Sequence, residues 1–153
     1  MQPKRMQLAV AKWVLGLLSS EELPEIATCA LETGHDTPAL RQLAGELRPV
    51  MSDVRPIFNK ALIELGTALP SKPEAGLIVA REYATEILEG TISPFEGARR
   101  IWREIQLDMP DLKPQLDPFV YWASEWEDAD DPGRRDYCES AIRTAARNIL
   151  DAT

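Results

Sequence analysis

An acidic run between residues 125 and 139, "EWEDADDPGRRDYCE", carries the oxygen ligands that a calcium ion prefers. Four of its acidic residues fall at positions 1, 3, 9 and 12 of an EF-hand loop: Asp128, Asp130, Asp136 and Glu139. Gly133 falls at position 6, where such a loop turns sharply. The four acidic residues are therefore the candidate metal ligands of the sequence.

Two departures from the EF-hand pattern favour another interpretation of the same residues. Pro132 occupies position 5, where calcium requires a side-chain oxygen, and Arg134 and Arg135 add positive charge beside the site. Asp131 instead has the side chain of a helix N-cap, and Pro132 then stands at the first helical position, where proline is favoured. We therefore expect a helix start here and keep cation binding as the alternative.

Other residues with catalytic chemistry are scattered along the chain. Glu82, Glu86 and Glu89 share one side of a predicted helix, where carboxylates can exchange protons or hold magnesium. With Arg81 beside them, a charged solvent face is the usual explanation of such a row. The single histidine, His35, falls in a predicted turn, and no motif places a nucleophile next to it. We expect no catalytic residue and no cofactor.

The stretch "GTISPFEGARRIW", residues 90–102, resembles a phosphate-binding loop only in its glycines and arginines, because it lacks the spacing of either common phosphate motif. Ser93 has the side chain of a helix cap, and Glu96 follows at the spacing of a capping box, in which its carboxylate returns to the Ser93 N–H. Three arginines fall largely on the polar side of the predicted helix and are candidates for contact with a partner: Arg99, Arg100 and Arg103. Glu96 and Arg100 also have the spacing of a helical ion pair.

Aromatic residues recur at helical spacing farther along, at Phe119, Trp122 and Trp126. This spacing favours a buried stripe over a cofactor-binding face. Tyr121 and Glu125 lie on the opposite, wetter face of the same predicted helix. We therefore add Tyr121 and Glu125 to the three arginines as interaction candidates.

The segment Glu86–Trp102, "EILEGTISPFEGARRIW", resembles a stretch found in a family of small, uncharacterised, all-helical bacterial proteins. In that stretch a helix ends in Ile-x-x-Gly-x-Ile, and a Pro-x-x-Gly helix start then leads to an aromatic residue. The resemblance implies a bacterial helical protein, and it brings no catalytic residue because the family has no assigned activity. Gly97 of this motif lies inside the predicted helix, where we expect a neighbouring helix to approach closely.

The elements that must position all these residues are helices. Apolar spacing and cap residues predict helices over about 6–18, 20–34, 37–47, 52–66, 72–89, 93–108, 118–127 and 132–150, and no strand. The segment "ALPSKP", residues 68–73, is a predicted linker and hinge, and "DMPDLKPQLDP", residues 108–118, is a predicted surface connection. We predict an all-α fold: one compact domain over residues 1–153, with seven or eight helices in an orthogonal bundle or a short helical-repeat-like array.

Composition limits the partners and the compartment. The 153 residues carry a net charge of −8 with a pI near 4.7, which disfavours nucleic acid and anionic membranes and favours a basic protein partner. Lys12 interrupts the apolar N-terminal stretch, which is typical of an amphipathic helix rather than a signal peptide, and no stretch has the length of a membrane span. We expect a cytoplasmic protein in which Cys29 and Cys138 are buried, reduced thiols.

Together these patterns predict a non-enzymatic, acidic helical module that binds another protein, as an immunity protein, an antitoxin or an adaptor does. One alternative is a metal-binding protein or an enzyme that uses the acidic loop between Asp128 and Glu139. Another is a nucleic-acid reader over residues 22–47, whose second helix would offer a DNA groove only Arg41, Gln42 and Arg48. A homo-oligomer also stays open.

Overall fold

The computed structural model describes residues 4–152, and every regular element in this range is helical, which confirms the all-α prediction. The chain forms two compact units that meet at the Pro70–Ser71 bond, inside the predicted linker. Each unit is described by itself, and one domain over residues 1–153 stays a prediction. None of the helices between residues 4 and 152 is long and apolar enough to cross a membrane.

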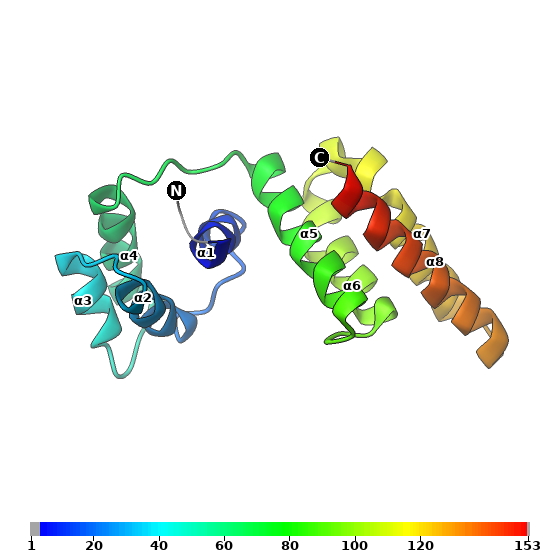
Figure 1. Ribbon diagram of the computed structural model, residues 1–153, viewed down its shortest axis with the longest axis horizontal. Coiled ribbons are helices and arrows are strands. Elements are labelled where there is room, and N and C mark those ends of the chain that lie inside the picture. Colours follow the sequence, from blue (N-terminus) through cyan, green and yellow to red (C-terminus); the bar gives the residue numbers. More distant parts are fainter. Residues whose placement is uncertain (1–3, 153) are drawn as a thin grey trace. The chain divides into compact units, whose positions relative to one another are not determined.

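The first unit contains four α-helices: α1 (Lys4–Val14), α2 (Glu22–Glu32), α3 (Pro38–Ala44) and α4 (Met51–Glu64) (Figure 1). Its core is built from leucines of α2 and α3 that surround the fully buried Phe58 of α4. Trp13 of α1 packs edge-on against Phe58, with ring centroids 4.7 Å apart, and its Nε1 donates to Asn59 Oδ1 (3.1 Å). One aromatic side chain thus ties the first helix to the fourth.

Several predicted boundaries in the first unit are wrong by a turn or less. The first helix ends at Val14 rather than Leu18, because Gly16 adopts φ +71°, a left-handed conformation that ends helices. The third helix ends at Ala44, so Leu47, which we expected to be buried, lies outside it with 94% of its surface exposed. The fourth begins at Met51, which places Pro56 in its second turn rather than its first.

The start of the second helix differs in its chemistry. We expected Ser20 to cap this helix, but α2 begins at Glu22 and its preceding residue makes no side-chain cap bond. The Glu22 carboxylate instead accepts hydrogen bonds from the Ser19 N–H (2.7 Å) and the Ser19 hydroxyl (3.2 Å). The predicted Ser20 cap is therefore wrong, and the side-chain bonds at this helix start run from Ser19, which precedes α2, to the acid of its first turn.

The second unit contains α5 (Lys72–Glu89), α6 (Pro94–Arg100), a π-helix η1 (Ile101–Ile105), the 3₁₀ turns η2 (Gln106–Asp108) and η3 (Pro110–Leu112), α7 (Lys113–Asp128) and α8 (Pro132–Asp151). The long helices α7 and α8 run side by side, and α5 packs along α8 (Figure 1). Ile101, Ile105, Phe119 and Ile142 are fully buried between them.

The proline-rich segment over residues 108–118 is not the surface connection that we predicted. Pro110 and Pro114 stand in the first turns of η3 and α7, where proline starts a helix instead of breaking one. Met109 and Leu112 are buried against α5, at Gly76. A Cβ added to Gly76 would lie 2.7 Å from Leu112 Cδ1 and 2.9 Å from Met109 Sδ, so the segment approaches α5 because that residue is a glycine.

The start of α6 follows the sequence closely. The Ser93 hydroxyl accepts the Glu96 N–H (3.1 Å), and Pro94 takes the first helical position. A Cβ on Gly97 would lie 2.5 Å from Ile87 Cγ1 of α5, which confirms the expected close approach of a neighbouring helix. Elsewhere in the chain, Cys138 is buried as predicted, whereas Cys29 is partly exposed, and both are free thiols.

Candidate interaction surface

The α7–α8 hairpin owes its geometry to a helix cap. Three residues, 129–131, separate the two helices, and the last of them, Asp131, accepts the Arg134 N–H at its Oδ1 (2.8 Å). Pro132 takes the first position of α8, as we predicted. Because the link is this short, the last turns of α7 and the first turns of α8 present their side chains to one common surface.

Three aromatic rings form a cluster on this surface. Trp122 of α7 lies edge-on to Tyr121, with centroids 4.8 Å apart, and edge-on to Tyr137 of α8, with centroids 5.5 Å apart. Tyr121 is 54% exposed and Tyr137 is 58% exposed. We predicted that Phe119 and Trp122 are both core residues, and this holds for Phe119, but Trp122 is only half-buried because the tyrosines, not the core, surround its ring.

An arginine is held over this aromatic cluster. The Arg134 guanidinium carbon lies 5.4 Å from the Tyr137 ring centroid and 5.9 Å from that of Trp122, within the range of cation–π attraction. Its Nη2 donates to Glu125 Oε2 (2.8 Å), and this hydrogen bond raises the pKa of Arg134. The planar guanidinium is therefore oriented before any partner arrives. We call Tyr121, Trp122, Glu125, Arg134 and Tyr137 the aromatic–arginine cluster.

A second stack fixes the neighbouring tryptophan. Phe95 of α6 stacks on Trp126 with ring centroids 3.9 Å apart, and the Arg135 guanidinium carbon lies 4.3 Å from the Trp126 centroid. Since Phe95 occupies one face of the indole, the guanidinium covers the other. The Trp126 Nε1 is buried without a hydrogen-bond partner among the described residues. This stack ties α6 to the hairpin, and Trp126, which we also expected in the core, is only half-buried.

A groove of about 620 Å³ runs between α7 and α8 from the aromatic–arginine cluster toward the end of α8. Its α7 wall consists of Pro114, Gln115, Pro118 and Trp122. Its α8 side begins at Tyr137 and continues with small or uncharged residues: Ser140, Ala141, Thr144, Ala145, Asn148, Ile149 and Ala152. None of these twelve described residues is charged, so the groove is uncharged along its length.

No family model, curated protein or solved structure matches this chain.

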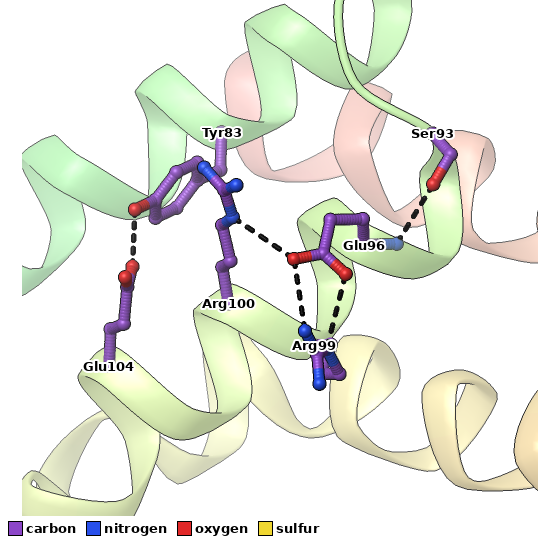
Figure 2. Close-up of polar contacts among 6 residues, drawn as sticks. All are labelled: Tyr83, Ser93, Glu96, Arg99, Arg100 and Glu104. Carbon is purple, nitrogen blue, oxygen red and sulfur yellow. Dashed lines mark hydrogen bonds and ion pairs between the residues drawn. The ribbon is translucent and has the colours of Figure 1, made fainter.

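The three arginine candidates of α6 and η1 lie outside the aromatic–arginine cluster. Glu96 accepts from Arg99 Nε (3.1 Å) and Nη2 (3.2 Å) and from Arg100 Nε (3.2 Å), as Figure 2 shows. The two arginines hold the pKa of Glu96 below its usual range, mainly through the hydrogen bond from Arg99. The predicted Glu96–Arg100 ion pair is therefore confirmed. The Glu96 carboxylate, however, accepts from the arginines and not, as a capping box requires, from the Ser93 N–H. Arg103 lies over Trp102, 6.0 Å from its centroid.

The interaction candidates predicted from the sequence therefore include only part of the aromatic–arginine cluster. Among the described residues, Tyr121 and Glu125 lie in this cluster, whereas Arg99, Arg100 and Arg103 contact Glu96 and Trp102 instead. Tyr137 was missed, although a signal for it existed. Trp122 lies eight residues before Asp130, the middle of the link, and Tyr137 lies seven residues after it, and a short hairpin brings such positions together.

The four candidate metal ligands are not assembled. Asp128 ends α7, Asp130 lies in the link, and Asp136 and Glu139 are on α8. Within residues 4–152, no group of three or more histidine, cysteine or acidic side chains is placed to hold a metal ion, and this includes the acidic row on α5. The acidic link thus begins a helix, as the cap interpretation required.

The π-helix η1 positions one further polar pair. The Tyr83 hydroxyl on α5 donates to the Glu104 carboxylate on η1, beside Arg100 (Figure 2). Burial raises the pKa of Tyr83, and the hydrogen bond to the negatively charged Glu104 raises it further. The pair ties α5 to η1 and keeps the phenol protonated.

Replacing Tyr83 with phenylalanine is expected to destabilise the second unit by about 1.5–3 kcal/mol at neutral pH, because a hydrogen bond to a carboxylate is lost. The raised pKa of Tyr83 makes a contribution to stability that is complete below the unfolded-state pKa of about 10 and is lost as the pH rises through the higher folded-state pKa. Urea unfolding of both proteins at neutral and alkaline pH tests this. The stability difference should shrink above about pH 10, and a difference that stays constant would contradict the assignment.

A second concave surface lies in the first unit, between α1 and α2. This groove of about 500 Å³ is lined by Arg5, Cys29 and His35, among others, and Arg5 Nη1 lies 3.7 Å from Cys29 Sγ. Its charged lining mixes two cations, Arg5 and Lys12, with three glutamates. This mixture singles out no ligand class.

Proposed function

We propose that this protein is a non-enzymatic interaction module that binds another protein through the aromatic–arginine cluster and the adjoining groove. The observation that carries the proposal is the exposure of Tyr121 and Tyr137 around a half-buried tryptophan, under an arginine that Glu125 already holds in place. Tryptophan, tyrosine and arginine are the residues that contribute most often to the affinity of protein interfaces.

Two features favour this surface over others on the chain. The cluster is pre-ordered by its ring contacts and by the Glu125–Arg134 hydrogen bond. Its side chains therefore lose little conformational entropy when a partner binds. The groove continues from it without interruption by charge, which gives a partner an uncharged surface beside the cluster. An immunity protein, an antitoxin or an adaptor would use such a surface in the same way.

Site-specific photo-cross-linking in the native cell tests the proposal. A benzophenone amino acid replaces Tyr137 in one protein, and Ile63 of α4, which is 79% exposed in the other unit, in the control. The expected result is one discrete adduct with another protein from position 137 and none from position 63. The purified partner should then bind Tyr137→Ala at least about 30-fold more weakly than the wild type and Ile63→Ala with unchanged affinity.

Two results would overturn the proposal. The first is the same set of adducts from both positions. The second is a partner whose affinity is unaffected by the loss of Tyr137. An adduct of the chain with itself would favour the homo-oligomer alternative.

A further inference from the structure

We infer that the segment of the partner that enters this surface is a basic amphipathic helix, which lies along the α7–α8 groove and places lysine or arginine side chains at the groove's two ends. The inference rests on the proposed function and adds the chemistry of the partner to it.

The α8 side of the groove has the length of a short helix. Its α8 side runs from Tyr137 to Ala152, which at 1.5 Å per residue is roughly 22 Å, the length of about four helical turns. Ser140, Ala141, Thr144 and Ala145 form its floor, and such small side chains let a third helix approach at the close spacing of helix packing, about 8–10 Å between axes.

The occupant is expected to be a helix rather than an extended peptide. An extended segment needs a strand edge to satisfy its backbone N–H and C=O groups, and both walls of this groove are helices whose backbone groups are already paired along their lengths. A helix satisfies its own backbone. Its apolar side chains can then meet Pro118 and Ala141, and its bulkiest residue can contact Trp122 and Tyr137 at one end.

The negative charge of the second unit favours a basic partner helix. Residues 71–153 contain 17 acidic and 10 basic residues, a net charge of −7 of the chain's −8. At the closed end of the hairpin, Glu127, Asp128 and Asp130 are exposed, and the run over 125–139 holds seven acidic residues against two arginines, both of which are engaged with aromatic rings. At the other end, the exposed Asp151 also favours cations, whereas the Ala152 carbonyl already accepts a hydrogen bond from Arg81 Nη2 (3.1 Å).

One cation borders the middle of the groove from outside its lining. The Arg147 Nη2 donates to the Thr144 hydroxyl (3.4 Å), so a positive charge borders the α8 floor between the acidic ends. A partner helix with lysines throughout would meet repulsion there. The arrangement favours a helix with cations near its ends and an apolar centre.

The test uses the full chain and two synthetic 20-residue amphipathic helices with one identical apolar face. One peptide carries lysines at both ends and the other carries glutamates at the same positions. NMR titration of the isotope-labelled protein should show the lysine peptide shifting the Trp122 indole and the amides of Ala141 and Thr144, with an affinity at least about tenfold above that of the glutamate peptide at low salt. The advantage should shrink at about 1 M salt, where charges are screened.

Two pairs of variants separate shape from charge. Thr144→Arg fills the groove, whereas Thr91→Arg adds the same charge in the α5–α6 turn, outside its lining. We expect at least about a tenfold loss of lysine-peptide affinity from the first and less than about twofold from the second. Neutralising Glu127, Asp128 and Asp130 as Gln, Asn and Asn should weaken the lysine peptide about tenfold, whereas Gln at Glu82, Glu86 and Glu89 should leave it within about twofold.

The outcomes distinguish this inference from the proposed function. If the glutamate peptide binds the same groove as tightly as the lysine peptide, the inference that the partner helix is basic is overturned. If a partner cross-linked through position 137 binds Thr144→Arg with unchanged affinity, the partner's helix does not lie in the groove, while the proposed function stands. If neutralising Glu82, Glu86 and Glu89 weakens lysine-peptide binding as much as neutralising Glu127, Asp128 and Asp130, the effect comes from overall charge. That result also overturns the inference.

Discussion

Leu112→Ala is expected to lower the free energy of unfolding of the second unit by about 2–5 kcal/mol, the usual cost of truncating a buried leucine. Leu112 is 3% exposed, and its Cδ1 occupies the space that a side chain at Gly76 would need. Removing it leaves a cavity between η3 and α5. Because α5 and the 3₁₀ turn are both fixed by further contacts, they have little freedom to close that cavity.

Leu107→Ala is the matched control, since Leu107 lies five residues away in η2 and is 61% exposed. Its truncation is expected to change the stability by less than about 0.5 kcal/mol. Urea unfolding followed by circular dichroism measures both variants. If Leu112→Ala were as mild as the control, the proline-rich segment would be the surface connection that its composition suggests, and the packing of Leu112 on Gly76 would be wrong.

The helix starts were predictable because their chemistry is local. Thr37, Ser71, Ser93 and Asp131 each accept an N–H from three residues ahead, and a proline follows each within the first turn. This pattern is contained in four consecutive residues, so the sequence holds all the information that it requires. Ser20 is not a cap, because α2 begins only at Glu22, and the side-chain hydrogen bonds at this start join Ser19 to Glu22.

Burial was predictable only where a helix continued. Leu47 keeps the spacing of Leu40 and Leu43, but α3 stops at Ala44 and the side chain turns to solvent. Trp122 keeps the spacing of the buried Phe119, yet its outer edge meets Tyr121 and Tyr137. The helical period gives a direction for each side chain, whereas the neighbouring element decides whether that direction is covered. The aromatic–arginine cluster depends on side chains from two helices, whereas the helical period describes the faces of one helix at a time.

Phe58→Ala is expected to lower the free energy of unfolding of the first unit by about 3–5 kcal/mol. Phe58 is fully buried in a core whose members all lie between Met6 and Leu62, and its ring carries the edge-on contact with Trp13. Truncation removes that contact together with the packing of α2 and α3 on α4. Phe119→Ala, which empties an equally buried site in the second unit, is the matched variant.

Amide hydrogen exchange, resolved by residue, separates the two possible domain organisations. If the units open independently, Phe58→Ala accelerates exchange in α2–α4 by a factor of more than about 100 and leaves α5, α7 and α8 unchanged, and Phe119→Ala does the reverse. If residues 1–153 form one cooperative domain, either variant accelerates the slowest amides of both units by the same factor, because these amides exchange only through global unfolding. The second result would establish the predicted single domain. The first would make the segment at Pro70–Ser71 a linker between two separately stable helical bodies, and would confine the effect of any partner on α7–α8 to the second of them.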